Sequence, residues 1–80
     1  MESAVKRIIF ELYNIDTEPQ ITRPEPEFGD FSTNVAMQLA KQLGKNPREI
    51  ATEITEALHQ TGEYSKVDIA GPGFINITVS

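Results

Sequence analysis

The sequence predicts a two-layer α+β domain in which helices cover one face of a small antiparallel sheet, in the order helix–strand–helix–helix–strand–strand. Three observations predict this class. Apolar residues recur at helical spacing in three segments, prolines keep another segment extended, and the last segment alternates polar and apolar residues. Because 80 residues are enough for one domain only, we expect a single domain over residues 1–80.

The first helix is predicted by an apolar stripe near the N-terminus. The stripe has the i, i+3, i+4, i+7 spacing of one helical face and consists of Val5, Ile8, Ile9 and Leu12. Ser3 is the expected N-cap. Asn14 is expected to end the helix, because asparagine tolerates a left-handed backbone.

The next segment is predicted to be extended, because Pro19, Pro24 and Pro26 exclude a helix. Residues 20–23 are expected to form one short strand. The chain from there to residue 31 is expected to be a long, stiff loop.

The second helix is predicted over the stripe Val35, Ala36, Leu39, Ala40 and Leu43. Asp30, Ser32 and Thr33 are competing N-cap candidates. Gly44 lies where a helix-ending glycine belongs.

The third helix has the clearest local signals in the chain. Asn46 is a good N-cap, and Pro47 fits the first helical position, where no backbone N–H is needed. The apolar stripe is Ile50, Ile54 and Leu58, and Thr61-Gly62 is expected to end the helix.

The last segment is predicted to be a β-hairpin, with strands at 66–70 and 74–79 joined by the turn 71–73. Alternation places one apolar set on a common face: Val67, Ile69, Ile75, Ile77 and Val79. Phe74, Asn76 and Thr78 lie on the opposite face. Since helices cover only one face, a large aromatic side chain is expected on the uncovered one.

Composition excludes several classes of protein. With no cysteine there is no disulfide framework or thiolate metal site, and with one histidine there is no His-rich metal site. The longest apolar run is three residues, far below the roughly 18 that a membrane span needs. A net charge of −5 argues against binding nucleic acid through a basic surface. A small acidic binding module is therefore favoured over an enzyme.

Phe74 and Asn76 are the first candidate site residues. An exposed ring offers a stacking surface for a nucleobase, and a carboxamide two residues further on offers one donor and one acceptor for its edge. In the alternative interpretation Phe74 lies under the proline-rich loop and Asn76 is a solvated strand residue. The pattern alone favours this alternative, because single exposed apolar residues are common.

Two glycines and three basic residues are further candidates. Gly71 and Gly73 would allow a ligand or another backbone to approach closely, although a tight turn explains them equally well. Lys41, Lys45 and Arg48 cluster at the junction of the two helices and are possible phosphate contacts. Alternatively, they belong to a solvated helix surface.

No catalytic or metal site is expected. Five acidic residues lie in the first loop, but the prolines between them hinder convergence on a cation: Asp16, Glu18, Glu25, Glu27 and Asp30. His59 lies near a predicted helix C-terminus, where a cation is favoured electrostatically, and we assign it no catalytic role.

Several blocks of sequence together resemble the N-terminal additional domain of arginyl-tRNA synthetase, a class I synthetase. The resemblance covers nearly the whole chain, in order, through Arg23-Pro24, Phe28-Gly29-Asp30-Phe31-Ser32-Thr33-Asn34-Val35-Ala36-Met37, Leu39-Ala40-Lys41, Asn46-Pro47-Arg48-Glu49-Ile50-Ala51 and Ala70-Gly71-Pro72-Gly73-Phe74-Ile75-Asn76. It implies a two-layer α+β domain that precedes a Rossmann-type catalytic domain and contacts the D-loop of tRNA(Arg). It also implies that Phe74 stacks on a D-loop nucleotide and that Asn76 hydrogen-bonds its edge.

The resemblance further implies what this chain does not do alone. The ATP-site signatures and the arginine pocket of the family are absent, so the isolated domain is expected to bind no cofactor and to catalyse nothing. ATP with Mg²⁺ is expected in a catalytic domain outside this chain. The expected partners are the tRNA(Arg) D-loop and the rest of the synthetase chain, for a cytoplasmic domain that is monomeric when isolated and binds no membrane. The alternative is a structural module that docks on the synthetase body or on another protein.

Overall fold

The computed structural model describes residues 1–79, which form three α-helices, four strands and one 3₁₀ helix. In chain order these elements are α1 (Glu2–Tyr13), β1 (Ile21–Thr22), η1 (Pro26–Phe28), β2 (Phe31–Thr33), α2 (Val35–Leu43), α3 (Pro47–Thr61), β3 (Tyr64–Ala70) and β4 (Phe74–Val79). The α+β class is confirmed.

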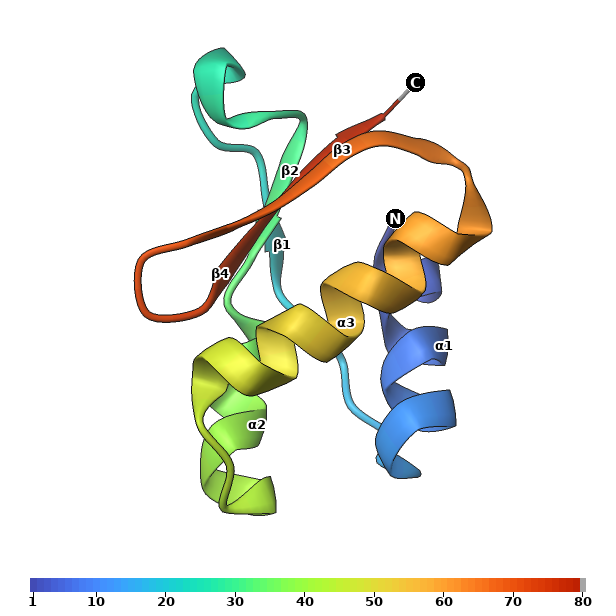
Figure 1. Ribbon diagram of the computed structural model, residues 1–80, viewed down its shortest axis with the longest axis vertical. Coiled ribbons are helices and arrows are strands. Elements are labelled where there is room, and N and C mark those ends of the chain that lie inside the picture. Colours follow the sequence, from blue (N-terminus) through green and yellow to red (C-terminus); the bar gives the residue numbers. More distant parts are fainter. Residues whose placement is uncertain (80) are drawn as a thin grey trace.

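The four strands form one antiparallel sheet in the order β1-β2-β4-β3. The predicted hairpin is confirmed, although β3 begins at Tyr64 rather than at residue 66, and its register pairs Val67 with Ile77 and Ile69 with Ile75. Figure 1 shows the three helices on one side of the sheet and η1 beyond its far end. The opposite face of the sheet, which we call the outer face, carries no α-helix.

The core lies between the helices and the inner face of the sheet. Its buried apolar residues come from all three helices and from β3 and β4: Val5, Ile8, Ile9, Val35, Ala36, Leu39, Ile50, Ala51, Ile54, Leu58, Val67, Ile75 and Ile77. Burying one of the Val, Ile or Leu side chains contributes about 1.5–3 kcal/mol. The core therefore fixes which face of β4 is left for contacts with other molecules.

The predicted helix boundaries are mostly confirmed. Asn14, Gly44 and Gly62 are all left-handed residues that end helices, and Asn46 caps α3 by accepting a hydrogen bond from the Arg48 backbone N–H at 2.9 Å. Such a cap contributes about 1 kcal/mol. The Asn46-Pro47 start fixes the position of Arg48, which contacts the β3–β4 turn.

Three details of the predicted helices are wrong. The N-cap of α1 is Met1, so Ser3 lies inside the helix, and Leu12 of the predicted apolar stripe is 43% exposed. The N-cap of α2 is Asn34 rather than any of the three candidates. Thr33 nevertheless helps the helix start, since its hydroxyl accepts a hydrogen bond from the Val35 N–H.

The largest correction concerns residues 24–33, because the sequence predicts a loop to residue 31 and helix caps at 32 and 33, and it does not predict β2. The segment contains η1 and then β2, which pairs with both β1 and β4 and so lies inside the sheet. Asp30 is not a helix cap, because its carboxylate accepts a hydrogen bond from the Val79 N–H at 2.8 Å. Ser32 is likewise a strand residue, paired with Asn76. The segment folds onto β4 instead of leading into α2 as a loop.

Within residues 1–79, no helix combines the length and the apolar character needed to cross a membrane.

Candidate nucleic-acid interface

The candidate interface lies on the outer face of the sheet. Alternation along β4 places Phe74, Asn76 and Thr78 on this face, away from the buried Ile75 and Ile77. Phe74 is 40% exposed, whereas Asn76 is half-buried. The expectation of an exposed aromatic ring on this face is therefore confirmed, and the partial burial of Asn76 is a further finding.

The neighbouring strands extend this face with polar groups. Asn76 lies between Ser32 on β2 and Asp68 on β3, and residues opposite one another in a sheet share a face. Lys66 is the partner of Thr78 and forms an ion pair with Asp68 at 3.3 Å. The floor of the outer face is thus polar.

The β3–β4 turn ends this face beside Phe74. Gly71 and Gly73 both have positive φ, and a Cβ on Gly73 would lie 3.0 Å from the Pro47 Cβ. The group that approaches Gly73 closely is therefore Pro47 of this same chain, whereas a Cβ on Gly71 would have only the Phe74 ring within 4 Å among the described residues. The Arg48 guanidinium donates a hydrogen bond to the Gly71 carbonyl, which ties the turn to α3.

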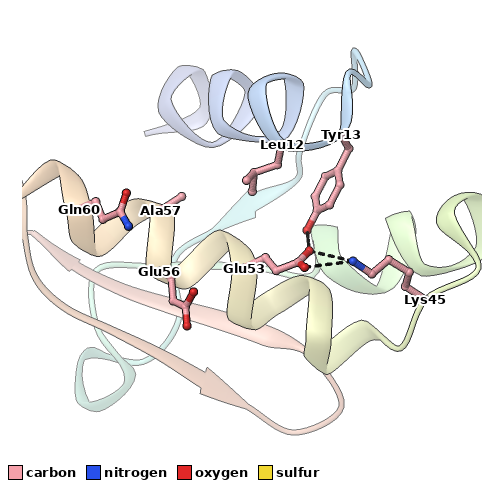
Figure 2. A pocket seen from close by; sticks show the side chains of 7 residues that line it. All are labelled: Leu12, Tyr13, Lys45, Glu53, Glu56, Ala57 and Gln60. Carbon is pink, nitrogen blue, oxygen red and sulfur yellow. Dashed lines mark hydrogen bonds and ion pairs between the residues drawn. The ribbon is translucent and has the colours of Figure 1, made fainter.

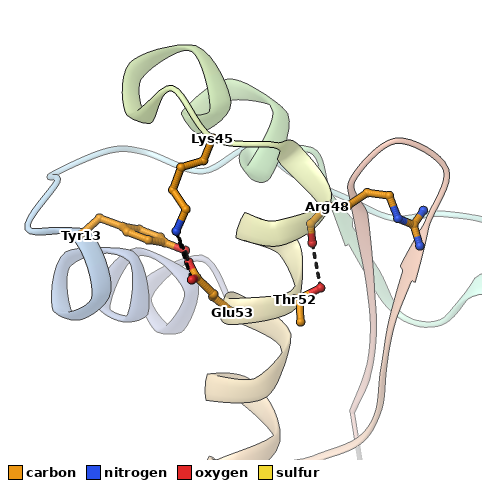
Figure 3. Close-up of polar contacts among 5 residues, drawn as sticks. All are labelled: Tyr13, Lys45, Arg48, Thr52 and Glu53. Atoms are coloured by element: carbon orange, nitrogen blue, oxygen red, sulfur yellow. Dashed lines mark hydrogen bonds and ion pairs between the residues drawn. The ribbon is translucent and has the colours of Figure 1, made fainter.

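The three basic candidates do not form one cluster. Figure 3 shows that Lys45 and Arg48 point to opposite sides of the start of α3. Arg48 points to the turn beside Phe74, and the contact with Gly71 uses one of its five N–H donors. Lys41 is exposed on α2, one helical turn after Met37, which lies near Gly73. Arg48 is thus the basic candidate fixed at the Phe74 end.

Lys45 is held by an ion pair away from the outer face. Its ammonium lies 3.1 Å from both carboxylate oxygens of Glu53 and 5.7 Å from the centre of the Tyr13 ring, while the Tyr13 hydroxyl donates to Glu53. These groups border a cavity of about 400 Å³ between α1 and α3, which Leu12 also lines (Figure 2). The cluster joins the C-terminal end of α1 to α3.

This cluster predicts an acid-sensitive contribution to stability. The hydrogen bond from Tyr13 and the contact with Lys45 lower the pKa of Glu53. Because the folded-state pKa lies below the unfolded one, the stabilisation is present above about pH 4.3 and is lost as the pH falls through the folded-state value. Glu53→Gln should cost at most about 1 kcal/mol at pH 7, since the ion pair is partly exposed, and should reduce the acid loss of stability.

The measurement is the free energy of unfolding in urea between pH 7 and pH 3. Glu56→Gln, the same change on a side chain that lines the same cavity, is the control and should keep the acid dependence of the parent. An unchanged acid dependence in Glu53→Gln would contradict the assignment.

The sequence did not single out Phe28 or Lys66. Both line a groove of about 480 Å³ along the outer face, together with Asn76 and Thr78. Polar and apolar alternation along 66–70 was the signal that could have placed Lys66 on the outer face. The structure pairs Lys66 with Thr78 on that face. No comparable signal was available for Phe28, whose position depends on the folding of η1 onto β4.

A smaller hollow of about 80 Å³ adjoins Phe74 on the β2 side. Asn34 lines it, and its buried Oδ1 has no hydrogen-bond partner among residues 1–79. The flank of the Phe74 ring is thus lined by polar side chains.

Within the described residues, no group of three or more acidic or histidine side chains is placed to hold a metal ion. His59 is exposed near the end of α3, away from the outer face of the sheet. The Phe74 ring offers a flat stacking surface, with the Asn76 amide beside it and the Arg48 guanidinium nearby. These groups are suited to binding a ligand.

Fold and site together define a small α+β domain whose uncovered sheet face carries an exposed aromatic side chain beside polar groups. Residues 1–79 match the family described as the arginyl tRNA synthetase N terminal domain. The chain belongs to this family.

Curated relatives agree with this assignment. The arginine–tRNA ligase of Thermotoga petrophila is 48% identical over 77 residues, which are 95% of this chain and 14% of that protein. The arginine–tRNA ligase of Thermobifida fusca is 55% identical over 64 residues, or 80% of this chain and 11% of that protein. The chain thus spans about one seventh of the length of the first of these relatives.

Two solved structures share the fold. The arginyl-tRNA synthetase of Plasmodium falciparum matches with a TM-score of 0.86 at 20% identity, over 99% of this chain and 15% of that one. The enzyme of Thermus thermophilus matches with a TM-score of 0.77 at 24% identity, over 99% of this chain and 13% of that one. At 20% and 24% identity, these matches show that the chain shares the fold of this part of the two structures.

Proposed function

We propose that this chain is the tRNA-recognition module of an arginyl-tRNA synthetase and that its outer face contacts the D-loop at the outer corner of tRNA(Arg). The observation that carries the proposal is the exposed ring of Phe74, next to the half-buried amide of Asn76, on the face that no α-helix covers. Single-stranded loops are the parts of RNA whose bases are free to stack on protein aromatics. A loop of tRNA fits this surface better than a duplex.

In this proposal the two side chains have different roles. Phe74 stacks on one unpaired base, a contact worth about 1–3 kcal/mol, and Asn76 hydrogen-bonds the edge of that base. Arg48, which holds the turn at Gly71, offers its remaining donors to a phosphate. Gly71 and Gly73 act indirectly, by shaping the turn that presents Phe74. Lys41 is an additional phosphate contact, whereas Lys45 is not, because Glu53 holds it on the other side of α3.

The charge of the chain fits a secondary contact. With a net charge of −5, few phosphates are neutralised, so the isolated module should bind tRNA weakly. Other parts of a cytoplasmic synthetase would supply most of the affinity, and this module would add a local contact that is effectively intramolecular. Under the same proposal ATP, Mg²⁺ and arginine bind in the catalytic part of the enzyme.

The test is an NMR titration of the 80-residue chain with tRNA(Arg). The signals of Phe74 and Asn76 are expected to shift progressively, with those of Arg48 and the β3–β4 turn. If these signals stay fixed at high tRNA concentration while a different surface shifts, the proposed site is wrong. If tRNA moves no signal but the catalytic part of the synthetase shifts Phe74, the alternative of a structural docking module is supported instead.

A further inference from the structure

The outer face carries a second exposed aromatic ring, for which the proposed function gives no role. Phe28 is 52% exposed, which is more than Phe74, and it lines the groove in which Asn76 and Thr78 form part of the floor. Phe74 borders the β3–β4 turn at one end of β4, whereas η1 meets β4 near Thr78. The outer face therefore has an aromatic ring towards each end.

The position of Phe28 is fixed by close backbone contacts. The Asp30 N–H donates to the Ile77 carbonyl at 2.8 Å, and the Asp30 carboxylate accepts from the Val79 N–H. Between Asp30 and Phe28, Gly29 lies so close to β4 that a Cβ there would be 2.9 Å from the Ile77 oxygen. Phe28 is thus held by a segment that is hydrogen-bonded to β4. Because this segment is already ordered, little conformational entropy is lost when a ligand binds.

One base cannot contact both rings. Phe74 and Thr78 are four residues apart, which corresponds to about 13 Å along a strand. The side chains between the two ends are polar groups suited to base edges and sugar hydroxyls, namely Asn76, Thr78 and Asp68. A face of this kind, with separated rings over a polar floor, resembles the sheets on which RNA-binding domains stack two or three bases.

The charged side chains that line the groove indicate how a bound RNA strand would lie. Glu27, Asp30 and Asp68 line the groove, and Lys66 is the basic residue among its lining side chains. Phosphates are repelled by this carboxylate cluster, whereas neutral bases are not. Bases would therefore enter the groove while the phosphates stay outside it, towards Arg48 at the Phe74 end.

We propose that the outer face holds two unstacked nucleotides of one single-stranded RNA segment, one on Phe74 and the other on Phe28. This inference rests on the proposed function and deepens it, since it extends the contact from one base to a short run of the loop. Phe28 then increases affinity for any loop that presents two free bases at the required separation.

The experiment is an NMR titration of the 80-residue chain with the trinucleotide ApApA, followed through the ring signals of both phenylalanines. Both sets of signals should shift along one saturation curve. Phe28→Ala should weaken ApApA binding by about 5- to 150-fold, the loss expected for one stacked base, and the Phe74 signals should still move at higher concentration. Phe28→Leu, which keeps the apolar bulk without the ring, should lose most of the same affinity.

Phe10→Ala is the matched control, because Phe10 is also 52% exposed but lies on α1. It should leave ApApA binding unchanged, and amide spectra of all variants should show the parent fold. If Phe74 shifts but Phe28 does not, and Phe28→Ala binds like the parent, the second stacking position is refuted while the proposed function stands. If neither ring responds to ApApA or to tRNA(Arg), both proposals fail.

Discussion

Phe74→Ala is expected to weaken tRNA(Arg) binding by about 5- to 150-fold, because under the proposed function it removes one base–aromatic stacking contact worth about 1–3 kcal/mol. Folding should be almost unaffected, since the ring is 40% exposed on the outer face and lies outside the core. In a full-length synthetase that carries this domain, kcat/KM for tRNA should fall while the KM values for ATP and arginine stay nearly unchanged. The measurements are a binding titration and steady-state aminoacylation.

The matched control for this variant is again Phe10→Ala, the same truncation at an exposed ring on the helical side of the molecule. It should leave both the affinity and kcat/KM for tRNA at parent values. An equal loss for tRNA, ATP and arginine in Phe74→Ala would indicate a folding defect. An affinity equal to that of the parent would remove Phe74 from the interface.

The parts of the fold that the sequence predicts correctly are those with signals inside a few neighbouring residues. The start of α3 at Asn46 and Pro47 and the left-handed ends at Asn14, Gly44 and Gly62 depend on local backbone preferences. The β3–β4 hairpin depends on alternation across a short turn. These features need no knowledge of the rest of the chain.

Strand β2 was not predictable by the same reasoning. It has three residues, follows two prolines closely, and is stabilised by pairing with β4 more than 40 residues further along the chain. Asp30 shows the same limit, because its partner is the Val79 N–H rather than a neighbouring helix start. A strand of only three residues is too short to show polar and apolar alternation in the sequence, and its pairing with a distant strand adds no local signal.

In the candidate site, too, local patterns predict the position of some residues, whereas contacts between distant segments determine the position of others. Strand alternation predicts that Phe74 and Asn76 share the outer face, and this placement is correct, whereas the partial burial of Asn76 was not predicted. The engagement of Lys45 with Glu53 and Tyr13 was not predictable, because it depends on how α1 packs against α3. Phe28 joins the same face as Asn76 only because η1 folds back onto β4.

Gly29 is the residue on which this arrangement depends most directly. Its φ of +111° lies in a region that side-chain-bearing residues rarely adopt, and an added Cβ would lie 2.9 Å from both the Ile77 carbonyl oxygen and the Thr78 hydroxyl. The carbonyl belongs to the central strand and cannot rotate away. A side chain at this position must therefore push η1 off the sheet.

Gly29→Ala is accordingly expected to lower the free energy of unfolding by about 2–5 kcal/mol, combining backbone strain with a steric clash. This is a large share of the total stability, which is about 4–12 kcal/mol for 80 residues. Gly44→Ala is the matched control: its φ is +63° but nothing lies within 4 Å of the added Cβ, so only strain of about 1–2 kcal/mol is expected. Urea unfolding of both variants measures the difference.

The same pair of variants connects the fold to the binding face. Where Gly29→Ala still folds, at low temperature or with a stabilising osmolyte, Phe28 should be displaced from the groove while Phe74 keeps its place beside the β3–β4 turn. Binding of ApApA should then fall as in Phe28→Ala, and the Phe74 signals should still respond. Equal destabilisation by Gly29→Ala and Gly44→Ala would mean that η1 moves away from β4 at no cost. That result would contradict the inference that η1 holds Phe28 in a fixed position in the groove.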